Sequence, residues 1–265
     1  MKRVAVCLSG LPGDLENSLC QIKNTFIDPL NADLFIWFWY SENPVRRDYL
    51  PLQIYNKNSM QEKIYKIVTP ITYKEIDYYT MHDEFIRLST LNEVTCAQRY
   101  LAHIPNYFSQ WYAVKEANCL KKNYEEQNNF VYDIVLRVRT EIYYERQLNY
   151  DDLKYHEKKV IIPLGYGDGN TYGAGLKSIN DFMAFGSSKN IDIYSSLYDY
   201  IPQYCQETYV IHSESHVLYH LQKNKIPIHR IVFKGKIMKN GKFPFGPTWR
   251  PGVEYPGDKI AEELQ

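Results

Sequence analysis

The sequence predicts an α/β fold in which a mainly parallel central sheet lies between layers of helices. Two short apolar runs, at residues 4–8 and 32–39, are typical of strands buried on both faces. A helical pattern at residues 15–28 separates them, which makes a strand–helix–strand unit with a right-handed crossover. A third apolar, β-branched run at 130–138 indicates a central strand. Repeated units of this kind favour a layered α/β sandwich.

The first half of the chain contains the clearest elements. The helix at 15–28 is expected because Leu15, Leu19 and Ile22 recur at helical spacing after the turn residues that end with Asp14, a candidate helix cap. The pattern then predicts a strand at 32–39, an irregular segment at 41–58, a possible strand at 64–68 and a long helix at 107–127. Residues 73–92 are polar and aromatic and fit no element clearly.

The second half is expected to contain shorter elements. The patterns indicate strands at 160–164, 181–186 and 231–233, a glycine-rich loop at 165–175, helices at 188–200 and 212–223, an Asn-Gly hairpin at 239–242 and a proline-containing extended tail from 243. We find no internal repeat and no linker that would divide the chain, so we expect a single domain over residues 1–265.

Composition excludes several classes of protein. Lys and Arg number 31 and so do Asp and Glu, and this zero net charge argues against non-specific nucleic-acid binding. The five cysteines are scattered without a CxxC pair, which disfavours a zinc cluster and a disulfide scaffold and favours a reducing compartment. No apolar stretch reaches the roughly 20 residues of a membrane span, so we expect a cytoplasmic protein without a transmembrane segment.

Ligands of open parallel sheets bind at the carboxyl ends of the strands, where the strand order reverses. This rule selects the loop at 9–14, the segment 137–141 and the region around 175–181. In the loop, Gly10 would let a nucleotide approach the backbone beside Ser9, and the following helix N-terminus would favour an anion. The loop matches neither GxGxxG nor a P-loop, and a plain tight turn is the other interpretation.

The segment 137–141 is the most informative. Arg137, Arg139 and Glu141 alternate along the end of an apolar strand and therefore share one side. Two guanidinium groups could bind a diphosphate, and Glu141 could bind a divalent metal ion or a sugar hydroxyl. A buried ion-pair network without a ligand is the alternative.

Other candidates are weaker by themselves. Asp181 opens a strand after the glycine-rich loop and could act as a general base or simply cap a turn. His212 and His216 share a helix face at a spacing that suits a metal, although a capped first helical turn is favoured. Lys115 and Asn118 are neighbours on the long helix and could face a ligand or solvent.

Several segments, in this order, resemble a family of small GT-A-type glycosyltransferases of large DNA viruses and bacterial polysaccharide loci. The opening strand and loop are similar, as are the second strand and the helix that precedes the central strand. The resemblance is carried by VAVCLSGLP at 4–12, NADLFI at 31–36, SQWY at 109–112 with Lys115 and Asn118, YDIVLRVRTE at 132–141, NDFMAFGSS at 180–188 and HSE at 212–214. These segments span about residues 3–235.

The resemblance implies a GT-A-like, Rossmann-type sandwich and the transfer of a sugar from a nucleotide diphosphate to a glycan hydroxyl. The donor would be bound by a set of seven residues, and Asp181 would be the catalytic base if the reaction inverts the anomeric centre. The donor-binding set is Ser9, Gly10, Lys115, Asn118, Arg137, Arg139 and Glu141. Residues 1–145 would bind the nucleotide sugar and 146–242 would form the acceptor side, in the cytoplasm of a bacterium or a virus-infected host cell.

The resemblance also implies a divalent cofactor, Mn²⁺ or Mg²⁺, held by Glu141. Two positions depart from the family pattern. Gly13 stands where the family usually has an arginine, and Glu141 replaces the signature aspartate. These departures favour the alternative of a catalytically silent module that binds a glycan or a protein, while a nucleotide-using enzyme such as a methyltransferase is a third possibility.

Overall fold

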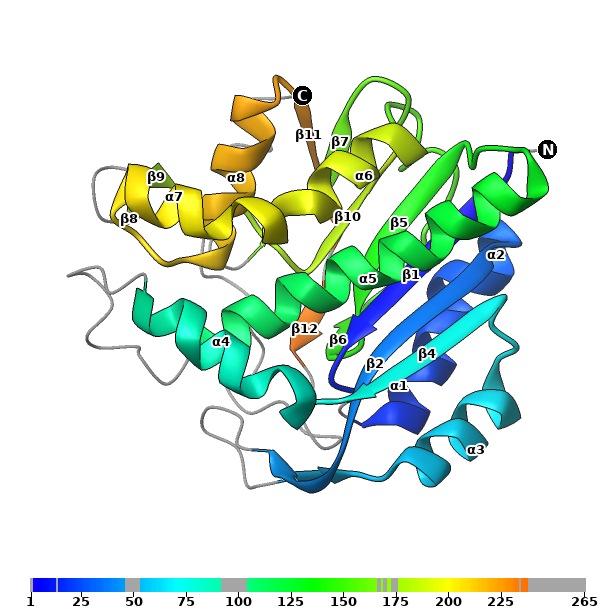
Figure 1. Cartoon of the computed structure of the whole chain (residues 1–265). Coiled ribbons are helices and arrows are strands. Elements are labelled where there is room, and N and C mark those ends of the chain that lie inside the picture. The colour runs from blue at the N-terminus through cyan, green and yellow to red at the C-terminus, as the bar shows by residue number, and fades with distance from the viewer. Residues whose placement is uncertain are drawn as a thin grey trace, which may run out of the picture.

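The protein is an α/β sandwich built on an eight-stranded sheet, as the sequence predicts (Figure 1). The computed structural model describes residues 2–12, 14–45, 53–91, 104–165, 168, 171–172, 176–233 and 235–237. The order along the sheet is β11-β7-β10-β5-β1-β2-β3, and β4 also pairs with β2. The strands of this sheet are β1 (Val4–Gly10), β2 (Asp33–Val45), β3 (Gln53–Tyr55), β4 (Thr72–Asp77), β5 (Ile134–Arg139), β7 (Val160–Pro163), β10 (Met183–Gly186) and β11 (Ile228–Ile231).

Helices cover both faces of the sheet, and two small ribbons complete the fold (Figure 1). The helices are α1 (Leu15–Ile22), which continues through a π-helical turn (Lys23–Ile27) into α2 (Asp28–Leu30), then α3 (Lys57–Ile67), α4 (Tyr79–Leu91), α5 (Ile104–Asn128), α6 (Ser188–Ser195) with a 3-10 turn (Ser196–Tyr200), α7 (Ile201–Thr208) and α8 (Ser213–Lys223). The ribbons pair β6 (Ile142–Tyr144) with β12 (Gly235–Ile237) and β8 (Thr171–Tyr172) with β9 (Leu176–Lys177).

The sheet is mainly parallel, and its order reverses beside β1. Strands β1, β2, β4 and β5 run in one direction, and β7 and β11 share it because the antiparallel β10 lies between β5 and β7. The chain builds outward from β1 to β2 and β4, then returns to place β5 on the other side of β1. The junction of β1 and β5 is therefore the switch point where a ligand site is expected.

The register brings the polar ends of the central strands together. Cys7 pairs with Arg137 and Ser9 pairs with Arg139, and paired residues of neighbouring strands point to the same face. That face is covered by α5 and α6, whereas α1 and α3 pack on the other (Figure 1). The apolar body of β1 and β5 is fully buried, which explains why these two strands read as continuous apolar runs.

Several predicted boundaries need correction. The run at 64–68 is not a strand but the end of α3, which starts inside the segment predicted to be irregular. Asn56 caps this helix by accepting a hydrogen bond from the Ser59 amide at 3.1 Å, and Met60 and Ile64 lie one turn apart and are buried. The irregular prediction for 41–58 also missed the end of β2, which runs to Val45.

Residues 73–92, which fit no element by sequence, form most of β4 and α4, and α7 was also missed. The predicted strands at 130–138 and 231–233 are shifted, because the observed strands are β5 and β11. Asp14 occupies the position before α1 without capping its backbone, since its carboxylate accepts from the Asn17 side chain at 2.8 Å. The predicted hairpin at 239–242, the tail from 243 and most of the loop at 165–175 lie outside the described residues. Within the described part of the chain, no helix is both long enough and apolar enough to cross a membrane.

Candidate functional site

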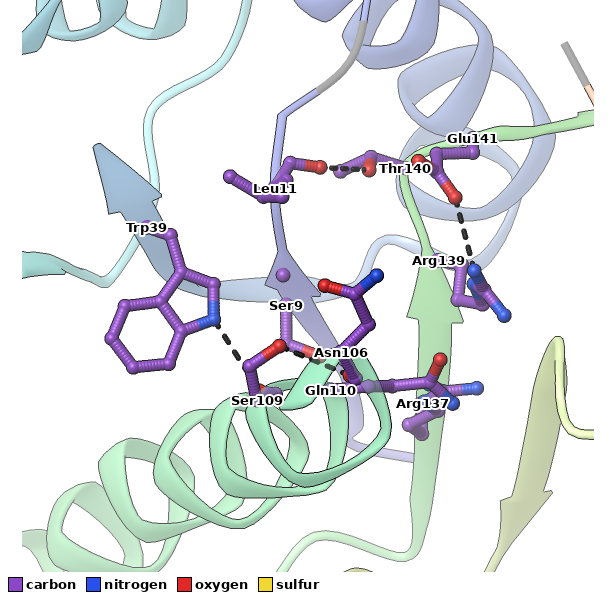
Figure 2. Close-up of a pocket in the computed structure, with 11 residues that line it drawn as sticks. Ser9, Leu11, Trp39, Asn106, Ser109, Gln110, Arg137, Arg139, Thr140 and Glu141 are labelled. Atoms are coloured by element: carbon purple, nitrogen blue, oxygen red, sulfur yellow. Dashed lines mark hydrogen bonds and ion pairs between the residues drawn. The ribbon is translucent and has the colours of Figure 1, made fainter. Parts of the chain in front are cut away.

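A basic pocket lies at the carboxyl ends of β1 and β5, where the strand order reverses (Figure 2). Its cavity volume is about 150 Å³, and it is lined by Ser9, Gly10, Leu11, Trp39, Asn106, Ser109, Gln110, Arg137, Arg139, Thr140 and Glu141. Five of the eight predicted site residues therefore meet in one pocket. They come from two of the three places that the strand-end rule selects.

The loop after β1 forms one wall of the pocket. Gly10 has a φ of +113°, a backbone conformation that residues other than glycine rarely adopt. No heavy atom lies within 4 Å of the position that a Cβ would take. The Thr140 hydroxyl donates to the Leu11 carbonyl at 2.8 Å and so ties the end of β5 to this loop. The glycine is needed for the backbone turn and leaves open space beside it.

Arg137 lies at the floor of the pocket and is almost completely buried, with 1% of its surface exposed. One Nη atom donates to the Asp181 carbonyl, and the guanidinium lies 5.6 Å from the centre of the Trp111 ring. Its buried Nε has no hydrogen-bond partner, and none of the carboxylates in the described segments forms an ion pair with it. Arg137 therefore brings into the pocket a buried charge that forms no ion pair in the described segments and that Asp181 stabilises only through space, an arrangement that favours a bound anion.

Arg139 lies two residues further along β5, and its guanidinium contacts a carboxylate on each of two sides. Its Nη2 donates to Glu141 Oε2 at 3.0 Å, and its Nη1 lies 3.5 Å from Asp181 Oδ1 (Figure 2 shows the Glu141 contact). Burial disfavours the charged form, but the two carboxylates outweigh this effect and raise the pKa of Arg139. The guanidinium is thus charged and fixed in orientation.

Asp181 lies beneath the pocket instead of lining it. Its carboxylate is buried, with 2% exposure, and Oδ2 accepts hydrogen bonds from Gln110 Nε2 at 2.7 Å and Ser213 Oγ at 2.5 Å. Burial alone would raise its pKa, but Arg139, Arg137 and these two donors lower the pKa below its ordinary value. Asp181 is therefore a negatively charged residue that orients the arginines.

Lys115 and Asn118 are not brought to this pocket. Lys115 Nζ lies 2.5 Å from Asp199 Oδ1, at the 3-10 turn after α6. Asn118 Nδ2 donates to Asp192 Oδ1 at 2.8 Å, on α6. Both side chains join α5 to the α6 region, because they leave the helix on a different side from Asn106 and Gln110.

The histidines of α8 have structural contacts. His212 caps the helix, with its Nδ1 accepting from the Ser215 amide at 3.3 Å. His216 is fully buried between the Tyr107 hydroxyl at 2.6 Å and the Thr208 hydroxyl at 3.3 Å, and burial lowers its pKa to about 4. The sequence favoured a capped and solvated first turn over a metal site. The cap is present, but the turn is not solvated, because Ser215 and His216 are buried.

Glu214, at the start of α8, also has a shifted pKa, in the opposite direction to that of Asp181. Burial, with the negative charge of Asp181 as a smaller cause, raises its pKa to about 8. Its Oε2 lies 3.1 Å from His212 Nε2, and burial lowers the pKa of His212 to about 4. Burial thus disfavours the charged form of both partners at the start of α8.

Sequence reasoning alone missed the part of the pocket that α5 contributes. Asn106, Ser109 and Gln110 occupy its first turns at spacings of three and four residues, and Trp39 Nε1 donates to the Ser109 carbonyl at 3.3 Å (Figure 2). Ser213 was also missed, although its hydroxyl is shared by Asp181 and the Trp111 indole at 2.9 Å. The resemblance motifs at 109–112 and 212–214 were the available signal, but they assigned no role to these side chains.

The pocket lining that the structure describes contains one carboxylate, Glu141. Among the residues that the structure describes, no three His, Cys, Asp or Glu side chains come together in a way that could hold an ion. Glu141 is occupied by Arg139. A hard cation such as Mg²⁺ or Mn²⁺ needs several oxygen ligands, and here guanidinium groups stand in their place.

The fold and the pocket define an α/β-sheet protein with a basic site at its topological switch point. The chain belongs to the family described as "Domain of unknown function (DUF7796)", whose model matches residues 1–255. No curated protein sequence matches the chain. Among solved structures, it is similar to the apo form of mouse xyloside xylosyltransferase 1, with 8% sequence identity and a TM-score of 0.44 over 87% of this chain and 84% of that one. The functional argument below rests on the residues of this chain.

Proposed function

We propose that this protein is a glycosyltransferase that takes a sugar from a nucleotide-diphosphate donor and transfers it to a glycan hydroxyl. The observation that carries the proposal is Arg137, a buried guanidinium that lines the pocket without a carboxylate partner among the described residues. A buried charge of this kind is expected where a ligand of opposite charge completes it. The order of motifs shared with small GT-A-type transferases supports the same function.

A diphosphate suits the two arginines better than other anions do. Arg137 and Arg139 stand two residues apart on one face of β5, so both can direct N–H groups to neighbouring phosphoryl oxygens. When a sugar leaves its donor, negative charge builds up on the departing diphosphate, and fixed positive groups stabilise that charge. The arginines would therefore contribute both to binding and to the transition state.

The loop after β1 would receive the nucleotide next to this diphosphate. Gly10 leaves open space beside the backbone, and Ser9 pairs with Arg139 in the sheet, so the two features are adjacent. The described cavity of about 150 Å³ has room for a compact anionic group more readily than for a complete nucleotide sugar. We therefore assign this deep part of the site to the diphosphate.

Asp181 takes a different role from the one predicted by sequence. A general base needs access to the acceptor hydroxyl and a pKa that allows it to accept a proton. Asp181 is buried, bonded to Gln110 and Ser213, and has a lowered pKa. We assign it to positioning Arg139 and do not assign the acceptor base to it. Lys115 and Asn118 are left out of the proposed donor site because their partners lie on α6 and the turn after it.

A silent binding module is the second candidate. It is favoured by the burial of Asp181 together with the pairing of Glu141 to Arg139, which leaves neither carboxylate available to accept a proton from an acceptor. Such a module would bind a nucleotide sugar or a glycan without turnover.

The test is titration calorimetry with UDP, GDP, CDP and dTDP, with S-adenosylmethionine as a non-diphosphate control, followed by hydrolysis assays with the matching nucleotide sugars. We expect one diphosphate to bind and Arg137→Met to weaken it about 10- to 150-fold, the value of a charge-assisted hydrogen bond. Arg3→Met, at the opposite end of β1, is the matched control and should bind normally. Binding without turnover of any nucleotide sugar would favour the silent module, and binding of S-adenosylmethionine alone would exclude glycosyl transfer.

A further inference from the structure

The carboxylates next to the pocket are already engaged by protein groups. Glu141 is 7% exposed, and its Oε2 accepts from Arg139 Nη2 at 3.0 Å. Asp181 Oδ2 accepts from Gln110 and Ser213, and Oδ1 lies 3.5 Å from Arg139 Nη1. A divalent ion at Glu141 would have to displace the Arg139 guanidinium. At Asp181 it could reach only Oδ1, the buried oxygen that accepts no hydrogen bond, and this oxygen already lies 3.5 Å from Arg139 Nη1.

We propose that Arg137 and Arg139 take the place of a divalent cation, so that the pocket binds the diphosphate group without metal. This inference rests on the proposed function. Two guanidinium groups carry the same formal charge as one divalent ion. They also offer planar, paired N–H donors whose geometry matches phosphoryl oxygens.

The two arginines contribute differently. Arg137 supplies a charge that forms no ion pair in the described part of the chain, and its buried Nε lacks an acceptor there. Arg139 supplies orientation, because Asp181 and Glu141 hold opposite ends of its guanidinium through Nη1 and Nη2. In this arrangement Glu141 is a positioning residue for Arg139 and not a metal ligand.

The arrangement reverses the usual effect of a divalent ion on binding. Excess Mg²⁺ or Mn²⁺ in solution neutralises the diphosphate that the arginines recognise, so it should weaken binding instead of strengthening it. A site built on a metal ion would show the opposite sign. The sign of this effect therefore separates the two arrangements without an assay of turnover.

The experiment is titration calorimetry of the full chain with pyrophosphate and with the four nucleoside diphosphates, in EDTA and in excess Mn²⁺ at matched ionic strength. We expect binding in EDTA and a lower affinity in Mn²⁺. Arg139→Met should weaken binding in EDTA by about tenfold or more, as expected for the loss of a charge-assisted contact. Glu141→Gln should weaken binding in EDTA less than Arg139→Met does, because its amide oxygen can still accept from Arg139.

The possible outcomes separate this inference from the proposed function. Binding that requires Mn²⁺ and is lost in Glu141→Gln would overturn the inference and leave the glycosyltransferase proposal standing. Pyrophosphate binding in EDTA without binding of any nucleoside diphosphate would support the arginine site and overturn the donor assignment. No binding of any of these anions in either buffer would overturn both. Circular dichroism of each variant confirms that it is folded.

Discussion

Arg137 combines deep burial with a charge that forms no ion pair with a carboxylate of the described segments. Its chain position is ordinary, at the fourth residue of an apolar strand. Such a residue lowers the stability of the empty protein, because a buried charge is costly unless it is paired. The Arg137 guanidinium lies 5.6 Å from the centre of the Trp111 ring, and Arg139 follows two residues later on the same strand. This is the pattern of a site in which binding and stability conflict.

Replacing Arg137 with methionine should separate these two properties. We expect Arg137→Met to have a free energy of unfolding no lower than that of the unchanged protein. The variant loses the hydrogen bond to the Asp181 carbonyl, but it no longer has the cost of burying a charge, and the second effect offsets the first. Diphosphate binding should be weakened at the same time. Urea denaturation followed by circular dichroism measures the first effect. A variant that is several kcal/mol less stable would show that Arg137 is a structural residue.

Glu214 predicts an unusual dependence of stability on pH. Its folded pKa of about 8 lies above the unfolded value, so between these values the folded state binds more protons and stability falls as pH rises. His212 and His216, with folded pKa values of about 4, act in the opposite direction but only below about pH 6.5. From pH 6.5 to 8 we therefore expect a loss of up to about 2 kcal/mol.

The measurement is urea denaturation at pH 6.5 and pH 8 for the unchanged protein and for Glu214→Gln, which cannot ionise. The variant should show a much smaller change between the two pH values. An equal slope in both proteins would contradict the raised pKa of Glu214.

At the scale of elements, α5 has two distinct functions along its length. Its first turns place Asn106, Ser109 and Gln110 in the pocket. Two turns before its end, Lys121 is fully buried and lies 2.9 Å from Glu125 Oε2 and 2.8 Å from Asp192 Oδ1. The helix is thus fixed to α6 by a buried ionic network, and this fixes where its first turns present side chains to the site.

Removing the cation of this network should destabilise the fold. Lys121→Ala leaves two carboxylates without their partner, and we expect a loss of about 3–5 kcal/mol in the free energy of unfolding. Lys122→Ala, the neighbouring exposed residue of the same helix, should change stability by less than about 0.5 kcal/mol. Thermal and urea denaturation of the pair test this. Equal stability of the two variants would show that the buried network contributes little.

At the scale of the whole molecule, one sheet joins the two halves that the sequence suggested. Strands β7, β10 and β11 follow residue 145, yet β10 pairs with β5 over four residue positions, and Ala184 lies opposite Arg137. Asp181, which orients Arg139, also comes from this later part. The donor side of the pocket therefore depends on residues from both halves.

We expect the chain to unfold in one cooperative transition. Three of the four tryptophans, Trp37, Trp39 and Trp111, lie in the first half and dominate its fluorescence. In a variant that carries Trp249→Phe, tryptophan fluorescence and circular dichroism at 222 nm should follow the same urea curve. A fragment of residues 1–145 should not fold, because the β10 edge of β5 is left unpaired. Separate transitions by the two probes, or a folded fragment, would indicate two independent units.

The elements that could be predicted from sequence are those in which the pattern of apolar residues shows which side chains are buried. Strands β1 and β2 contain continuous apolar runs, and the buried Trp111, Val114 and Ala117 recur every three residues along α5. Both signals depend only on neighbours along the chain. The prediction of a strand at 64–68 was wrong because a run of five mixed apolar and polar residues fits a strand and the last turn of a helix equally well. The alternation of Arg137 and Arg139 predicted their shared pocket for the same local reason.

The sequence by itself determined the α/β class, the central strands and the meeting of Ser9, Gly10, Arg137, Arg139 and Glu141 at one sheet edge, because local periodicity and the strand-end rule suffice for these. Only the tertiary structure decided what these side chains contact. Asp181 is buried beneath the arginines, Glu141 pairs with Arg139, and Lys115 and Asn118 turn to the α6 region. Such contacts depend on how distant segments pack and on which charged groups become buried and lose their hydration. The spacing of residues along the chain predicts neither.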